Sequence, residues 1–165
     1  HHMSHLWEME VYNDYIDFYH GEKVGVGLVT ASKIYHQAAK YMKEHEFSVK
    51  EKMDVEEEAI KNAFTKPGMY ESIMEENTPN LLELIHSQDL IDKKDEIIKI
   101  IEEIPTADEL KAMLAKVKGV NCLEDLGFDH SFQKKTAFLS PYVRARITFM
   151  RVLKFYDFYE QIISE

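Results

Sequence analysis

The sequence predicts an all-α fold, a multi-helix bundle that forms one domain over residues 1–165. Apolar residues recur at helical spacing along nearly the whole chain, and no segment sustains the two-residue alternation of a half-buried strand. The 6 glycines and 4 prolines fall mostly between these periodic stretches, where they mark helix ends. A chain of this length is long enough to bury its own core.

The first two helices are defined by a polar break and a long apolar stripe. Residues 3–11 form the first predicted helix, which Asn13 and Asp14 end. The second predicted helix covers residues 21–43 and carries an apolar stripe along one face. That face carries Val24, Leu28, Ala31, Ile34, Tyr35 and Ala38.

Capping signals and turn residues define the next two helices. Ser48 and Glu51 have the spacing of a capping box, which predicts a third helix from Ser48 to Phe64. The turn residues 66–68 end this helix, because proline and glycine do not continue it. A short helix over residues 69–76 follows.

The second half of the chain continues in the same way. Residues 78–101 predict another helix, and the polar segment 87–89 allows a break within it. Thr106 and Glu109 form a second capping box, and the helix that they begin ends at Gly119.

The last part of the chain predicts one turn and one helix. Residues 123–126 form a single turn before Gly127, and Pro141 begins the last helix. Its buried contacts are expected from Ile147, Met150, Leu153, Phe155 and Phe158.

Charge and composition exclude several classes of function. The net charge of −10 repels a nucleic-acid backbone and no basic stripe opposes it, so we expect no nucleic-acid binding. No apolar run approaches the roughly 20 residues that span a bilayer, so we expect no membrane insertion. Cys122 is the single cysteine and no secretory signal opens the chain, which favours a cytoplasmic protein. Cys122 also lacks the partners of a catalytic thiol.

Four of the eight histidines lie within the first twenty residues: His1, His2, His5 and His20. On a helix, His1 and His5 share one face, and so do His2 and His5. His20 begins a helix, where the positive end of the dipole keeps its ring neutral for metal ligation. A catalytic zinc usually takes three protein ligands, so at least one more must come from elsewhere.

Simpler interpretations of these residues remain open. The first histidines resemble the remnant of a purification tag, and His20 also suits a helix cap or a core position. Gly25 and Gly27 indicate close packing, either against a neighbouring helix or against a ligand. The remaining histidines are expected on the solvated surface: His36, His45, His86 and His130.

Several segments together carry a family resemblance. HHMSHLWEM and HGEKVGVGLVTASKIY lie at the start, and IPTADELKAMLAKVKG, LEDLGFD and AFLSPYVRARITFMRVL lie later. The last segment contains an Arg-x-Arg-x-Thr element at Arg144, Arg146 and Thr148. In this order they resemble the C-terminal helical domain of the sn-glycerol-1-phosphate dehydrogenases. The superfamily also includes glycerol dehydrogenase, iron-type alcohol dehydrogenases and 3-dehydroquinate synthase, some of which share the HGE motif.

The resemblance implies a dehydroquinate synthase-like C-terminal α-domain that holds a divalent metal, zinc or nickel. It assigns His1 and His20 as metal ligands, together with an aspartate from a preceding domain. His5 would lie beside the substrate and the nicotinamide and relay a proton. His2 replaces His1 as the ligand if the helix register differs by one. We expect Arg144 and Arg146 to form structural ion pairs rather than to bind phosphate.

The implied reaction is the NADH- or NADPH-dependent reduction of dihydroxyacetone phosphate to sn-glycerol 1-phosphate. The Rossmann-like domain that binds NAD(P)H is expected outside these residues, so the chain alone should be inactive. A glycerol dehydrogenase, a dehydroquinate synthase-like enzyme and a non-catalytic helical interaction module are the alternatives. An exposed apolar patch around Val24, Gly25 and Leu28 would favour a homo-oligomer.

Overall fold

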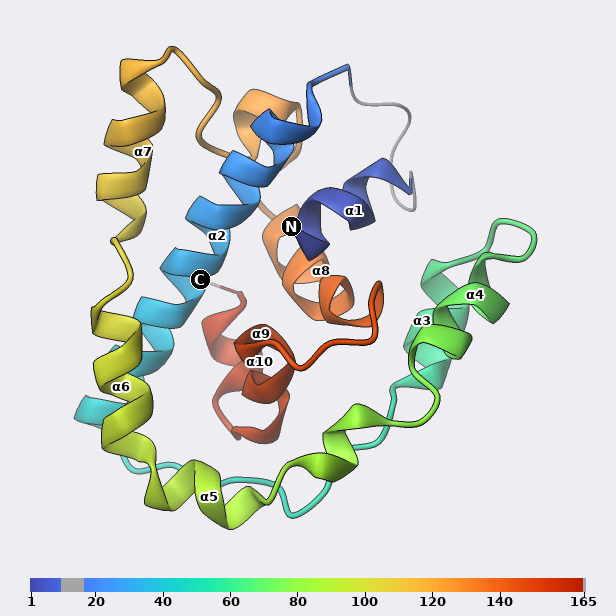
Figure 1. The fold of residues 1–165 in the computed structure, drawn as a ribbon, viewed down its shortest axis with the longest axis vertical. Helices are drawn as coiled ribbons and strands as arrows, with labels where there is room; N and C mark the ends of the chain where they lie inside the picture. Colours follow the sequence, from blue (N-terminus) through green and yellow to red (C-terminus); the bar gives the residue numbers. More distant parts are fainter. Residues whose placement is uncertain (10–16, 165) are drawn as a thin grey trace.

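The computed structural model describes residues 1–9 and 17–164, and they form an all-α multi-helix bundle (Figure 1). In these two ranges the β pairing consists of one isolated bridge between Val49 and Tyr156, so the predicted fold class is confirmed. Within the same ranges, no helix combines the length and apolarity needed to cross a bilayer.

The elements are mostly short apart from one long helix. The α-helices are α1 (His2–Glu8), α2 (His20–Glu44), α3 (Glu57–Ala63), α4 (Met69–Glu76), α5 (Ser87–Asp92), α6 (Lys94–Glu102), α7 (Ala107–Lys116), α8 (Phe132–Leu139), α9 (Phe149–Val152) and α10 (Tyr159–Ile162). The 3-10 helices are η1 (Leu81–Leu84), η2 (Glu124–Leu126), η3 (Ser140–Tyr142) and η4 (Leu153–Phe155).

The long helix α2 is the centre of the packing. It contacts α6 and α7 along one side, and α1, α9 and α10 also pack against it (Figure 1). Its buried Val26, Ile34 and Met42 belong to the main apolar cluster, which also takes in Trp7 of α1 and the C-terminal aromatic residues. A second apolar cluster joins α3 and α4 to η3 around Phe64 and Tyr142.

Elements with local signals lie where the sequence predicts them. The helix α2 differs from its predicted bounds by one residue at each end. At the start of α7, Glu109 accepts hydrogen bonds from the backbone N–H of Thr106 at 2.8 Å and from its hydroxyl, also at 2.8 Å. Gly127 has a φ of 82°, which suits glycine because this residue has no Cβ.

The predicted helix from Ser48 to Phe64 is wrong in its first half. Asp157 Oδ2 accepts hydrogen bonds from the backbone N–H of Ser48 at 2.9 Å and from its hydroxyl at 2.7 Å. The N–H of Lys50 donates to the carbonyl of Phe155 at 2.8 Å, and Val49 bridges to Tyr156. Ser48 therefore binds a distant carboxylate instead of capping a helix, and the helix α3 begins only at Glu57.

Other predicted boundaries also need correction. The stretch 78–101 is divided into η1, α5 and α6, and α5 begins at Ser87 inside the segment proposed as the break. The end of the first helix is Glu8; the predicted positions at 10–11 and the polar pair at 13–14 lie outside the described residues.

The C-terminal helix begins later than predicted. Pro141 lies in η3, and α9 begins at Phe149, where the hydroxyl of Thr148 accepts the N–H of Arg151 at 3.3 Å. Ile147 is 47% exposed, whereas the other predicted core residues of this segment are buried. The helix α8 was not predicted at all.

An ion pair joins a buried lysine, Lys154, to a half-buried glutamate, Glu56. Lys154 is 1% exposed, and its Nζ donates to Glu56 Oε2 at 2.6 Å. The hydroxyl of Tyr142 donates to the same oxygen at 2.5 Å. The Lys154 Nζ also lies 3.7 Å from the ring centroid of Phe138 and 4.7 Å from that of Tyr142, which are cation–π distances.

This buried lysine predicts that stability rises with pH in the alkaline range. Burial lowers the pKa of Lys154 to about 8, below its ordinary value of 10.5. Between these values the unfolded chain binds more protons than the folded chain, so the free energy of unfolding increases as pH rises. We expect an increase of about 2 kcal/mol between pH 8 and 10, before tyrosines with raised pKa values reverse it.

Urea denaturation across this pH range measures the effect. The Lys154→Met variant has no ammonium to titrate, so the difference in stability between it and the unmodified chain isolates Lys154. An unmodified chain whose stability stays parallel to that of Lys154→Met from pH 8 to 10 would contradict the prediction.

Candidate metal and substrate site

The helix α1 lies against the start of α2 (Figure 1). Three histidine rings lie close together at this contact. The ring centroids of His1 and His5 are 4.7 Å apart, those of His1 and His20 are 5.1 Å apart, and those of His5 and His20 are 5.5 Å apart. His1 and His5 are joined by a helical hydrogen bond, from the N–H of His5 to the carbonyl of His1. Only the packing of α1 on α2 brings in His20.

Glu8, at the end of α1, lies beside two of the three histidines, His5 and His20. Its Oε1 lies 2.8 Å from His20 Nδ1 and 3.0 Å from Lys23 Nζ, and its Oε2 lies 3.5 Å from His5 Nδ1. A carboxylate on Nδ1 fixes the ring and leaves the opposite nitrogen, Nε2, available to a metal. The sequence signal for Glu8 was its position three residues after His5, on the same helix face.

The electrostatics keep several groups in the form that suits ligation. Burial alone would raise the pKa of Glu8, but the hydrogen bonds from His20 and Lys23 outweigh it and lower the pKa overall. The pKa of His5 is lowered by burial and then by Arg144. Burial also lowers the pKa of His2 to about 4, with a smaller contribution from nearby positive charge. His2 and His5 are therefore neutral near pH 7.

The described residues supply a partial ligand set. In the ranges 1–9 and 17–164, no three His, Cys, Asp or Glu side chains are arranged as a metal-ligand group. A metal held by His1 and His20 therefore needs at least one further donor. The ring contacts include His1 and not His2, whose buried Nδ1 has no hydrogen-bond partner.

A cavity of about 240 Å³ adjoins the cluster. It is lined by His1 and His2, by Gly27 and Tyr35 of α2, and by Arg146 and Thr148 among other residues. Two residues of the Arg-x-Arg-x-Thr element, Arg146 and Thr148, therefore line the same cavity as the N-terminal histidines. Sequence reasoning did not place these two elements beside the same cavity, because nothing local links them.

The two arginines of this element differ. Arg144 Nη1 lies 3.5 Å from Glu76 Oε1, which agrees with the expected ion pair. Arg146 is exposed and lines the cavity. The ion pair expected for it is not found in the described part of the chain, where its side chain has no carboxylate partner. Arg146 is thus the arginine that can meet an anionic group in the cavity.

Glu8→Gln is expected to weaken metal binding without removing a ligand. An amide keeps the size of the side chain but loses the negative charge that orients His20, and such changes typically cost about 10- to 100-fold in metal affinity. Competition with a chromophoric zinc chelator measures this cost. Glu22→Gln is the matched control, because Glu22 accepts the N–H of Tyr19 at the helix start instead. Equal affinities for both variants would contradict the role of Glu8.

The four remaining histidines lie outside the cluster. His36 differs from its expected solvated state, since its Nε2 lies 3.0 Å from the carbonyl of Ile104. His45, His86 and His130 are exposed, as expected.

The cysteine and one glycine also have structural explanations. Burial raises the pKa of the Cys122 thiol, which agrees with its assignment as unreactive. An added Cβ at Gly25 would lie 3.3 Å from Leu114, so this glycine packs against α7.

The predicted apolar patch on α2 is only partly exposed. Leu28 is 49% exposed, but Gly25 is buried and Val24 is half-buried. The exposed part of the patch is therefore smaller than the sequence suggested.

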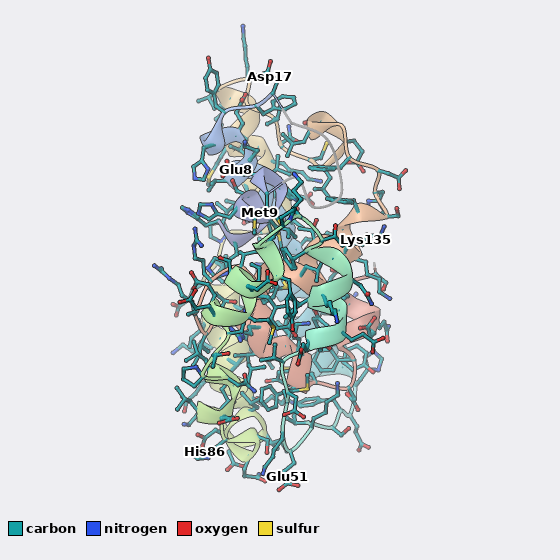
Figure 2. The ribbon with its side chains drawn as sticks, turned by 90° about the vertical axis from the view of Figure 1, so that its right-hand side faces the viewer. Glu8, Met9, Asp17, Glu51, His86 and Lys135 are labelled. Atoms are coloured by element: carbon teal, nitrogen blue, oxygen red, sulfur yellow. The ribbon has the colours of Figure 1, made fainter. Side chains whose placement is uncertain are left out.

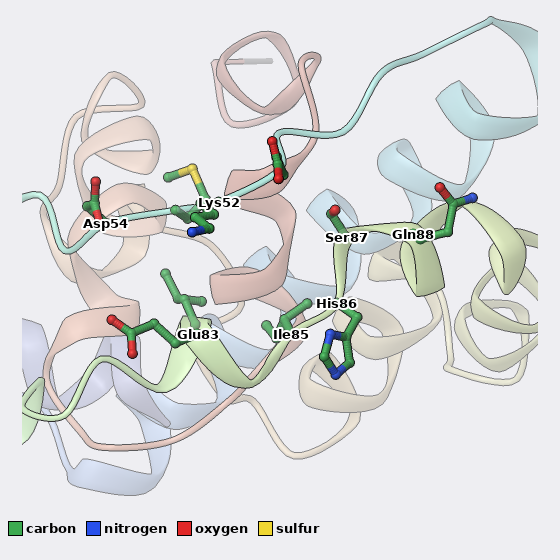
Figure 3. Close-up of a pocket in the computed structure, with 10 residues that line it drawn as sticks. Lys52, Asp54, Glu83, Ile85, His86, Ser87 and Gln88 are labelled. Atoms are coloured by element: carbon green, nitrogen blue, oxygen red, sulfur yellow. The ribbon is translucent and has the colours of Figure 1, made fainter.

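A roomier cavity, of about 630 Å³, lies far from the histidines. Figure 2 shows Glu8 toward one end of the molecule and Glu51 and His86 at the other. Figure 3 shows this cavity between the extended segment that carries Lys52 and Asp54 and the chain around His86. Its carboxylates outnumber its lysine, so it does not suit a phosphorylated substrate.

Comparisons with models of protein families, with curated proteins and with solved structures find no match for this chain. Its function is therefore inferred from the geometry of the site together with the family resemblance of the sequence.

Proposed function

We propose that this chain is the metal-binding helical domain of an NAD(P)-linked dehydrogenase of the sn-glycerol-1-phosphate type. The close approach of the His1, His5 and His20 rings, with Glu8 beside His5 and His20, carries the proposal. The cavity with Arg146 adds support, because a positive group beside the histidines suits a phosphorylated triose.

Each residue has a separate task in this proposal. His1 and His20 hold a divalent ion, zinc or nickel, with a further donor from outside these residues. When bound, that ion supplies Lewis acidity to a substrate carbonyl. His5 relays a proton from solvent to the substrate oxygen as that oxygen gains charge: its neutral ring takes up one proton and passes one on. Glu8 keeps His20 oriented. NAD(P)H, which the resemblance assigns to a separate domain, would supply the hydride.

Arg146 is proposed to bind the substrate phosphate. In the full-length protein, Arg146→Met is expected to raise KM for dihydroxyacetone phosphate about 10- to 100-fold, the range of a lost hydrogen bond to a charged group. KM for dihydroxyacetone, which lacks the phosphate, should stay unchanged. Arg144→Met is the control: Arg144 pairs with Glu76 and lies near His5, so any effect of this change should be equal for both substrates. Equal effects of Arg146→Met on both substrates would contradict a phosphate contact.

Substrate profiling of the full-length protein tests the proposed reaction. NAD(P)H oxidation that depends on dihydroxyacetone phosphate supports it. Turnover confined to glycerol, or cyclisation of a dehydroquinate synthase substrate, would replace it within the same superfamily. A non-catalytic helical module predicts no turnover and no specific metal binding. Turnover of dihydroxyacetone phosphate by the 165-residue chain alone would refute the need for a separate cofactor domain.

A further inference from the structure

A small cavity of about 90 Å³ lies between α2, the start of α7 and the segment 121–133. Water occupies about 30 Å³ per molecule in the liquid, so this space holds about three waters. A group of a few heavy atoms fills this space. None of its lining residues belongs to the histidine cluster or to the cavity beside it.

The cavity wall is rich in positive charge. Lys33 of α2 and Lys111 of α7 line it from two helices. Ala107 also lines it and is the first residue of α7, a helix of 10 residues whose amino end carries partial positive charge. Glu124 is the opposing carboxylate, and its Oε1 lies 3.5 Å from His130 Nδ1, which provides it with a partner.

A buried amide in the same wall lacks an acceptor. Gln133 of α8 is 5% exposed, and its Oε1 accepts a hydrogen bond from Lys33 Nζ at 3.3 Å. Its Nε2 is buried and has no hydrogen-bond partner. An unsatisfied buried donor is costly, and proteins usually supply such a group with a partner. Gln133 lines the cavity, so an anion bound there becomes the acceptor for this amide once the side chain turns toward it.

We propose that this cavity binds a small tetrahedral oxyanion such as phosphate or sulfate. Lys33 and Lys111 neutralise its charge, and Gln133 donates one hydrogen bond to it. The site is independent of the proposed dehydrogenase function and of the phosphate contact at Arg146.

Thermal unfolding with added inorganic phosphate, at constant ionic strength set by chloride, tests the site. We expect a saturable rise in Tm, because an anion that binds only the folded chain stabilises it. Lys111→Met and Gln133→Met should each weaken the apparent affinity about tenfold or more. Far-UV circular dichroism checks that both variants fold.

Two controls separate this site from other phosphate contacts. Lys116→Met changes an exposed lysine on the same helix α7, and Arg146→Met removes the contact proposed for the substrate. Lys116→Met should keep the phosphate affinity of the unmodified chain, and Arg146→Met should keep the part of the Tm rise that Lys111→Met removes. Loss of the Tm rise in Arg146→Met alone, identical affinities in all variants, or no saturable rise in the unmodified chain would each overturn the proposal.

Phenyl phosphate distinguishes a free ion from a phosphate group on a larger molecule. Because the cavity is small, we expect phenyl phosphate not to compete with inorganic phosphate. Competition that is lost in Lys111→Met would instead assign a phosphoryl group of a larger ligand to the same cavity.

Discussion

Glu56→Ala is expected to lower the free energy of unfolding by about 3 kcal/mol at pH 7, because it leaves a buried ammonium without its carboxylate. Lys154 Nζ lies 2.6 Å from Glu56 Oε2, and the lysine side chain is almost fully enclosed. The loss falls at the low end of the range for broken buried pairs. The aromatic rings of Phe138 and Tyr142 still stabilise the cation, and the lysine can lose its proton.

A second substitution separates charge burial from packing. Adding Lys154→Met to Glu56→Ala removes the unpaired ammonium, so the double variant should regain most of the lost stability. Urea denaturation with a full double-mutant cycle measures this coupling. Glu58→Ala is the matched control, since Glu58 is an exposed carboxylate nearby and should change stability by less than about 0.5 kcal/mol. An equal cost for Glu56→Ala and Glu58→Ala would contradict the role of the buried pair.

His20→Ala is expected to reduce zinc affinity by at least about 100-fold, more than the loss of a ligand's hydrogen-bond partner costs. His20 contributes the one ring of the cluster that comes from α2, and Glu8 holds its Nδ1 at 2.8 Å. The measurement is a chelator competition on the N-terminally acetylated chain, because acetylation prevents the α-amine of His1 from chelating zinc.

Two further histidine variants serve as controls. His45→Ala changes an exposed histidine at the other end of α2, and it should leave zinc affinity unchanged. His2→Ala should also retain affinity, whereas His1→Ala should lose it, which tests the assignment between these neighbours. Unchanged affinity in His20→Ala would remove the metal site and favour the helical interaction module.

Local signals in the sequence were sufficient for part of the fold. The stripe of apolar residues defines α2, and the box of Thr106 and Glu109 defines the start of α7, because both depend on residues within one or two helical turns. At Ser48, the local capping signal predicted a helix start that the structure does not have. Its partner Asp157 lies 109 positions away, so an equally good local capping box was overruled by a distant carboxylate.

The C-terminal segment shows the same limit. Pro141 and the following apolar residues suggested one continuous helix, but the chain forms η3, an exposed stretch at 144–147 and then α9. Arg144 and the backbone N–H of Ala145 bind Glu76 of α4, which holds this stretch outside a helix. This contact joins residues far apart in the sequence, so periodicity alone could not reveal it.

The sequence by itself determined the all-α class, the long central helix and the shared face of His1 and His5, because each follows from helical periodicity. Only the tertiary structure decided that His20 joins these rings, that Glu8 links them, and that Arg146 reaches the adjoining cavity. These contacts depend on how α1 and the C-terminal segment pack on α2. Such packing is set by side-chain shape and burial over long sequence separations, which no local pattern encodes.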